Sequence, residues 1–350
     1  MNTISRMRQM EALGADWWND SCDLRELSEA VAAGAVGATS NPVIVATAVA
    51  EDRARWIPVL DQLVQGHPTE TEDELTWRLI AEIGRQAAAI LRPTFDRTGG
   101  VKGYLSMQVN SKFYPSREKM LEQGKFLASL APNIAIKAPA IPSGIAAMEE
   151  LTAQGIRVNA TVSFTVAQAV ACAEAFERGL KRASNSGSIR PYVTIMIGRV
   201  DDQMKRYEAA AKTGIDPAYL EWAGVAVFRR AAQLFRERGY RSTLLCAAYR
   251  NDKHWAEIIG PDVLQSIPYK WWKQFDASDR QPRVTISEQV DPKIMAELSA
   301  KIPDFRRAYD EHGLSPAEFV RYGGSVHTLT QFLGGYASLL EITRGRMLAA

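Results

Sequence analysis

The chain has 350 residues, of which 46% are hydrophobic and 23% charged, and its formal net charge is +2 at pH 7. These proportions are typical of a globular protein with a sizeable core, and a charge so near zero gives no electrostatic reason to expect binding to nucleic acid or to a membrane. The most apolar stretch, 31–50, is interrupted by glycines and a proline, which excludes it as a membrane span.

Short runs rich in Val, Ile and Thr alternate with longer amphipathic stretches along the whole chain. In chain order, the runs predicted as β-strands are 15–20, 36–40, 101–110, 133–138, 156–163, 191–197, 241–248 and 262–267. Apolar residues at three- and four-residue spacing predict helices between them, including 23–33, 72–91, 116–130, 141–154, 165–181 and 219–238. The long interval between the second and third strands is expected to hold two helical stretches.

Repeated strand–helix alternation predicts an α/β fold with a parallel sheet, and eight strands favour a closed (β/α)8 TIM barrel over an open doubly wound sheet. We expect a single domain over 1–350, with an N-terminal helix, a barrel over about 14–285 and a helical extension over about 286–350 that packs across the barrel. Two helix starts are marked by Asp216-Pro217 and by Ser315-Pro316, where Glu318 completes a capping box.

Polar residues of one parity follow three neighbouring predicted strands. Side chains alternate between the two faces of a strand, and the chemistry of this architecture lies at the carboxyl ends of the strands. The polar positions of the third, fourth and fifth strands are Ser106, Gln108 and Asn110, then Lys137, and then Asn159, Thr161 and Ser163. We therefore expect these side chains to converge inside one end of the barrel, with the apolar positions facing the outer helices.

Lys137 stands alone among apolar residues near the end of the fourth strand, which Pro139 terminates. A lysine is rarely fully buried without a reason, although it can extend out of a strand end or form a structural ion pair. The polar residues expected around it favour a functional reason. Burial disfavours the charged amine, and a neutral amine is a nucleophile suited to Schiff-base formation.

Six motifs, in order and with matching spacing, resemble those of the transaldolase family of class I aldolases over roughly 16–275. They are Asp20-Ser21-Cys22-Asp23, Ala38-Thr39-Ser40-Asn41-Pro42, Ile136-Lys137-Ala138-Pro139, Val158-Asn159-Ala160-Thr161, Gly198-Arg199 and Tyr249-Arg250-Asn251. Any one motif is weak evidence, since Asn41 followed by Pro42 is also a simple helix start. The ordered set is a strong signal.

The resemblance implies a role for each matching position. Lys137 would form the Schiff base with a ketose, and Asp20 would be the acid/base that takes a proton from the substrate hydroxyl. The remaining polar positions would contact the dihydroxyacetone unit and a catalytic water, namely Asn41, Asn159, Thr161 and Thr194. Arg199 and Arg250 would hold the substrate phosphate, for which the guanidinium fork is suited. An alternative for Arg199 is a surface ion pair with the neighbouring Asp201 or Asp202.

Three positions depart from the family pattern. Gln108 stands where transaldolases carry a Glu, and an amide can hold a water but cannot exchange a proton. The related fructose 6-phosphate aldolases also carry Gln there and pair it with a Tyr two strands on, a substrate-site position occupied here by Met196. Ala248 replaces the Ser that usually completes the phosphate site.

We therefore expect an enzyme that transfers a dihydroxyacetone unit from a ketose phosphate donor to an aldose acceptor, by default in the pentose phosphate pathway. Two alternatives remain: an aldolase that releases dihydroxyacetone, and a catalytically weakened sugar-phosphate-binding protein. No metal or organic cofactor is expected, because the four histidines lack ligand spacing. Three distant cysteines indicate a reducing compartment, so we expect a cytoplasmic protein, and the sequence leaves assembly into homo-oligomers open.

Overall fold

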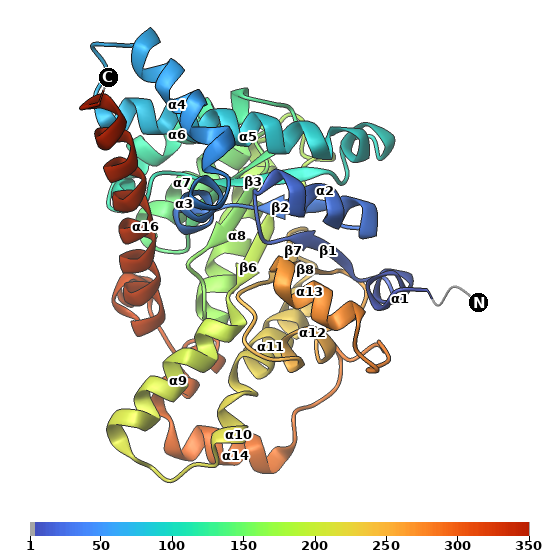
Figure 1. The fold of residues 1–350 in the computed structure, drawn as a ribbon. Helices are drawn as coiled ribbons and strands as arrows, with labels where there is room; N and C mark the ends of the chain where they lie inside the picture. The colour runs from blue at the N-terminus through green and yellow to red at the C-terminus, as the bar shows by residue number, and fades with distance from the viewer. Residues whose placement is uncertain (1–3, 350) are drawn as a thin grey trace.

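The computed structural model describes residues 4–349. Eight parallel strands form a closed barrel in which each strand pairs with its neighbours in chain order and β8 pairs with β1 (Figure 1). The strands are β1 (Asp16–Asn19), β2 (Gly37–Thr39), β3 (Tyr104–Gln108), β4 (Ile134–Pro139), β5 (Val158–Thr161), β6 (Tyr192–Ile195), β7 (Thr243–Cys246) and β8 (Val263–Ile267). The predicted TIM barrel is confirmed, with all eight predicted strands in place.

Helices surround the barrel, beginning with α1 (Arg6–Ala12) before the first strand. Those that follow strands β1 to β8 are α2 (Leu24–Ala33), α3 (Pro42–Glu51), α4 (Arg53–Gly66), α5 (Glu72–Arg97), η1 (Ser111–Phe113), α6 (Arg117–Ser129), α7 (Pro142–Ala153), α8 (Val166–Arg182), α9 (Ile197–Ala211), α10 (Pro217–Leu220), α11 (Ala223–Arg238), α12 (Lys253–Ala256) and α13 (Tyr269–Asp276).

Two details of the helix prediction and one of the strand prediction are wrong. The interval after β2 holds three helices rather than two, since α3 and α4 are separate elements joined at Asp52, which caps α4. The predicted helix 219–238 is divided into α10 and α11. The third strand ends at Gln108, because Asn110 leaves the sheet to cap η1 through a bond from the Lys112 N–H. Asn110 therefore does not extend the polar stripe of β3.

Hydrogen bonds between non-adjacent strands show which side chains point into the barrel. Asn159 on β5 donates to Ser106 on β3 at 3.0 Å, with β4 between them. Thr39 on β2 similarly bonds Ser266 on β8 at 2.6 Å, with β1 between them. Such pairs can meet only on the concave side of the sheet. The predicted polar stripes therefore face the interior.

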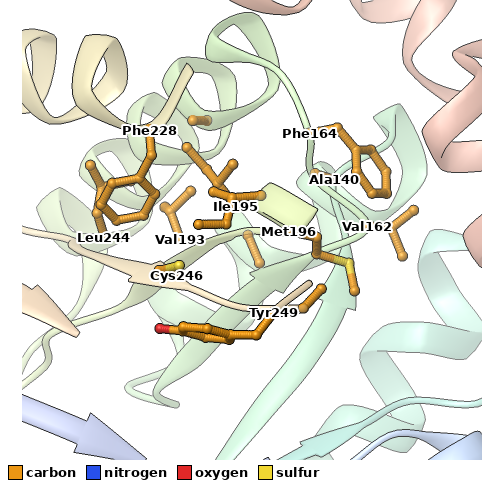
Figure 2. Packing of buried hydrophobic residues seen from close by; sticks show 14 of the residues in the cluster. Ala140, Val162, Phe164, Val193, Ile195, Met196, Phe228, Leu244, Cys246 and Tyr249 are labelled. Atoms are coloured by element: carbon orange, nitrogen blue, oxygen red, sulfur yellow. The ribbon is translucent and has the colours of Figure 1, made fainter. Parts of the chain in front are cut away.

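Alternate positions on the strands pack outward against the helices. Figure 2 shows this layer at the sixth and seventh strands, where Val193, Ile195 and Leu244 gather near Phe228 of α11. Met196 lies beyond the end of β6, farther from Phe228 and towards Val162. The apolar faces are thus used for packing, as the alternation predicts.

An apolar cluster fills the lower part of the barrel interior. It consists of Trp18, Tyr104, Ala135, Tyr192, Leu245, Ala247 and Leu264, which six different strands or their ends contribute. The rings of Trp18 and Tyr192 meet edge to face with their centroids 4.8 Å apart. Because these side chains occupy the interior, they close the barrel beneath the polar residues at the carboxyl ends of the strands.

The C-terminal extension consists of α14 (Pro292–Lys301), α15 (Pro303–Tyr309), η2 (Pro316–Arg321) and the long α16 (Gly323–Met347). The capping box of Ser315 and Glu318 is present, although it begins a 3-10 helix. Figure 1 shows α16 running past α9, α3 and α4, and α16 also contacts η1. Since α3, η1 and α9 follow the carboxyl ends of β2, β3 and β6, α16 lies beside the rim where the polar residues converge.

Close packing holds α16 in this position. A Cβ at Gly335 would lie only 2.8 Å from the backbone nitrogen of Val43 on α3, so a larger residue could not occupy this position without moving one helix. Among the helices of residues 4–349, none is both long and apolar enough to cross a membrane.

We expect Trp18→Ala to lower the free energy of unfolding by about 3 to 5 kcal/mol, because it empties the centre of the interior cluster. The matched control is Phe126→Ala, which removes a ring that is 48% exposed, compared with 2% for Trp18. Guanidinium denaturation of both variants checks this. Equal losses of unfolding free energy in the two variants would show that the interior cluster contributes no more to stability than an exposed ring does.

Candidate active site

Lys137 lies inside the barrel with only 4% of its surface exposed. On β4 it stands in register between Gln108 of β3 and Asn159 of β5, and its Nζ donates to the carbonyl oxygen of Ser40 at 3.4 Å. Burial lowers the pKa of Lys137 to about 8; attraction to Asp20 opposes this shift and repulsion from Arg199 adds to it. About a tenth of the amine is therefore neutral and nucleophilic at pH 7, far more than for an ordinary lysine.

Asp20 follows β1, and its backbone N–H donates to the Ile267 carbonyl at 3.0 Å. Burial raises the pKa of this carboxyl group, while the charge of Lys137 and a hydrogen bond from Thr39 act to lower it. Asp20 is half-buried, and a carboxyl group whose affinity for a proton is raised in this way is suited to general acid/base work.

Two hydroxyl groups, neither of which was predicted as a site residue, form a chain of hydrogen bonds that ends at the Asp20 carboxylate. Thr39 Oγ1 donates to Asp20 Oδ1 at 2.5 Å and lies 2.6 Å from Ser266 Oγ. Since the Thr39 proton goes to Asp20, Ser266 must donate to Thr39. Both residues occupy interior positions at the carboxyl ends of their strands. The same alternation that identified the polar stripes of the other strands would have found them.

Asn159 connects three strands across the interior. Its side-chain nitrogen donates to Ser106 Oγ at 3.0 Å, and its oxygen accepts from Thr194 Oγ1 at 2.7 Å. These bonds fix which end of the amide faces each neighbour. Asn159 and Thr194, both predicted as substrate contacts, therefore lie together, and Asn159 is the neighbour of Lys137 across the sheet.

Gln108 and Thr161 present buried oxygen atoms that have no hydrogen-bond partner among the described residues. Gln108 Nε2 donates to Ser111 Oγ at 3.1 Å, but Gln108 Oε1 and Thr161 Oγ1 are unpaired. Buried polar atoms are nearly always satisfied by protein or by a bound molecule. Because Gln108 is directly beside Lys137 on the neighbouring strand, these atoms are well placed to accept or hold a water or a substrate hydroxyl.

Asn41 and Met196, also predicted as substrate contacts, lie in different surroundings. The Asn41 side-chain oxygen accepts from the N–H groups of Val43 and Ile44 at 2.9 and 3.0 Å, so Asn41 does cap a helix, as the alternative held. Met196 precedes α9 with 6% of its surface exposed, and its N–H donates to the Ser163 carbonyl at 3.0 Å. Contact of either side chain with substrate stays a prediction.

Arg199 lies in the first turn of α9, where burial and the nearby Arg250 lower its pKa to about 10. Its guanidinium group donates to Thr328 Oγ1 of α16 at 3.3 Å and to Gln331 of the same helix. The alternative of an ion pair with Asp201 or Asp202 is wrong, because those carboxylates have other partners. The extension thus reaches the predicted phosphate site, which its sequence did not indicate.

Asp201 and Asp202 both act on the loop that carries Arg250. Asp202 pairs with Arg250 at 3.0 Å, and Asp201 Oδ2 lies 2.7 Å from Nε2 of His254, with both side chains fully buried. The Arg250 N–H donates to Nδ1 of His254 at 3.0 Å. Nδ1 therefore carries no proton, and Nε2 must donate to Asp201. This chain of bonds fixes the backbone of Arg250.

Close approach of two backbone segments completes this part of the site. Ala248 adopts a positive φ of 68°, and a Cβ at Gly198 would lie 1.9 Å from the Ala248 carbonyl oxygen. Only glycine at position 198 lets the loop after β7 pack against the start of α9. Arg199 and Arg250 are brought to the same rim in this way.

We expect Thr39→Val to raise the pKa of Asp20, because it removes the hydrogen bond that stabilises the carboxylate while keeping the shape of the side chain. The titration midpoint of the Asp20 carboxyl carbon, followed by ¹³C NMR and assigned with Asp20→Asn, should move to higher pH. Ser266→Ala is the control, since it leaves the Thr39–Asp20 bond in place and should move the midpoint less. An unchanged midpoint in Thr39→Val would contradict this account.

The interior thus combines a partly neutral buried amine, a carboxylate that can exchange a proton, and amide and hydroxyl groups that can orient a polyol. These are the groups that imine formation followed by carbon–carbon bond cleavage requires. Within residues 4–349, no cluster of three or more His, Cys, Asp or Glu side chains is arranged to hold a metal ion.

The comparisons agree with this chemistry. Residues 17–313 match the family model described as transaldolase/fructose-6-phosphate aldolase. The chain is 30% identical to Transaldolase 1 of Streptomyces avermitilis over 299 residues, which cover 76% of this chain and 78% of that protein. It is 29% identical to the transaldolase of Thiobacillus denitrificans over 340 residues, or 90% of each chain. This chain therefore belongs to the transaldolase/fructose-6-phosphate aldolase family of enzymes.

Proposed function

We propose that the protein transfers a dihydroxyacetone unit from a ketose phosphate to an aldose acceptor through an imine on Lys137. The observation that carries this proposal is the Lys137 amine, buried in the barrel with a pKa lowered to about 8 and with Asp20 close enough to shift it. Family membership supports the same reaction, since the compared relatives are named transaldolases.

The reaction begins when the neutral Lys137 amine attacks the ketose carbonyl and water leaves, which gives a protonated imine. Asp20 then takes the proton of the hydroxyl on the second carbon beyond the carbonyl. The bond between this hydroxyl-bearing carbon and the carbon next to the imine carbon breaks, and its electron pair passes towards the imine. An aldehyde leaves, and an enamine remains on Lys137. Addition of this enamine to a second aldehyde reverses these steps, with Asp20 returning its proton.

The other polar residues are assigned supporting roles. Asn159 is held by Ser106 and Thr194 with its amide oriented, which suits it to position the hydroxyls of the three-carbon unit. The unpaired oxygens of Gln108 and Thr161 suit a water needed for imine formation and hydrolysis. Arg199 and Arg250 at the rim would hold the phosphate, because the guanidinium group binds anionic oxygens in pairs.

A second candidate is an aldolase that hydrolyses the imine and releases free dihydroxyacetone, and Gln108 is the observation that favours it. The amide replaces the proton-exchanging Glu expected of transaldolases, as in the fructose 6-phosphate aldolases. Met196, however, cannot supply the proton-donating hydroxyl of the Tyr that accompanies Gln in those enzymes. We therefore favour the transferase. The three buried free cysteines suit a reducing compartment, and we assign the reaction to the cytoplasm.

Borohydride reduction in the presence of fructose 6-phosphate should leave a stable three-carbon adduct on Lys137, located by peptide mass mapping. The reason is that the imine forms, cleavage follows, and the remaining imine is reduced. Lys137→Met is the matched control and should give no adduct. A six-carbon adduct would show binding without cleavage and would favour the weakened sugar-phosphate-binding protein. No adduct with any ketose phosphate would remove the imine mechanism.

We expect Gln108→Glu to raise the ratio of transfer to free dihydroxyacetone release, because a carboxyl group beside Lys137 restores proton exchange with the water. The transfer product and free dihydroxyacetone can be measured in parallel reactions, one with and one without an aldose acceptor. Gln65→Glu on the exposed surface is the charge-matched control. If the ratio is the same in Gln108→Glu as in the unaltered enzyme, Gln108 does not decide between the two activities.

A further inference from the structure

At the predicted phosphate site, which we call the anion end, Arg250 makes an ion pair that the proposed reaction does not require. All three nitrogens of the Arg250 guanidinium group are already bonded within the protein. Nε and one Nη lie 3.1 and 3.0 Å from the same oxygen of Asp202, and the other Nη donates to the Tyr249 carbonyl at 2.9 Å. The edge of the fork formed by Nε and the Nη that contacts Asp202 is therefore occupied, and a phosphate can bind that edge only if the Asp202 carboxylate moves away.

The rest of the rim offers a phosphate fewer donors than two free arginines would. Arg199 donates to Thr328 and Gln331 of α16 through one Nη, its buried Nε has no partner among the described residues, and Ala248 has no hydroxyl to offer. With Asp202 counted, the three charged groups sum to +1 rather than the +2 of the two arginines alone. The negative charge of Asp202 also reaches Arg199, where it acts to raise the pKa.

We propose that Asp202 is a specificity-determining residue that competes with the distal phosphate of the substrate for Arg250, so that the enzyme discriminates weakly between phosphorylated and unphosphorylated sugars. This inference rests on the proposed function, in which Arg250 contacts the distal end of the substrate. A sugar with a distal hydroxyl can accept a hydrogen bond at the rim without displacing the carboxylate. A phosphate dianion must overcome both the existing ion pair and the repulsion of Asp202.

The geometry of Asp202 allows this exchange. Its side chain is 30% exposed and that of Arg250 is 39% exposed, so the pair is accessible to solvent and to an incoming anion. Asp202 lies one turn after Arg199 on α9, whereas the Arg250 backbone is held separately through His254. Removing the Asp202 carboxylate therefore leaves the main anchor of the Arg250 loop in place.

Binding of inorganic phosphate to the intact enzyme, measured by isothermal titration calorimetry, tests the competition without any turnover. Asp202→Asn should tighten phosphate binding about fivefold, the size expected for an exposed ion pair, and Asp202→Glu should restore the original affinity. Arg250→Ala should weaken binding in both backgrounds. Glu221→Gln is the matched control, because this carboxylate is 31% exposed and pairs with Lys205 and Lys253 instead of Arg250.

The same variants are then compared with fructose 6-phosphate and fructose as donors. Asp202→Asn should lower KM for the phosphorylated donor and leave KM for fructose unchanged, with similar kcat for each. Weaker phosphate binding in Asp202→Asn would mean that Asp202 holds Arg250 ready for the anion, and would overturn the inference. Unchanged binding in Asp202→Asn would also overturn it. Neither result affects imine trapping on Lys137, which tests the proposed reaction separately.

Discussion

The Lys137 amine must be kept away from water for its pKa to fall, and much of the barrel serves this purpose. Keeping water away requires a strand buried on both faces, with helices outside and an interior closed from below. The aromatic cluster around Trp18 and Tyr192 provides that closure, so part of the core that stabilises the barrel also sets the chemistry of its carboxyl end. Burial alone would favour the uncharged forms of both groups, which suits the amine as a nucleophile but would leave the Asp20 carboxyl group unable to accept a proton. The mutual attraction of Lys137 and Asp20 keeps both groups within reach of proton exchange near neutral pH.

A framework of uncharged hydrogen bonds holds this pair in place. The hydroxyl groups of Ser266 and Thr39 donate in sequence towards Asp20, and Asn159 is fixed between Ser106 and Thr194. Two of these bonds, Thr39 with Ser266 and Asn159 with Ser106, join strands that are not neighbours, and so they depend on the closure of the barrel. Rigid strand ends position reacting groups more accurately than loops do, which explains why the amine, the carboxylate and the oriented amide all come from strands or their immediate ends.

Much of this could be predicted from the sequence, because it follows from alternation along single strands. The parity of Gln108, Lys137 and Asn159 was enough to place them on one face, and strand count gave the barrel. Contacts between distant segments could not be predicted in this way. The partner of Arg250 proved to be Asp202, and that of Arg199 proved to be α16, because choices among nearby charges depend on side-chain geometry that no local pattern records. Asn110 was misplaced because its capping bond ended the strand two residues early.

The reacting end of the site is formed by strands, whereas the anion end is formed by loops and α16. This difference bears on how members of one family come to act on different sugars. Strands hold the reacting end, where a shift of a fraction of an ångström would separate the amine from the carbonyl. Loops and α16 hold the anion end, where Ala248, Asp202 and Gln331 contribute contacts that can change without moving Lys137. Loop residues vary more easily than buried strand residues. Substrate choice can therefore change at the rim while the imine chemistry beneath it is retained.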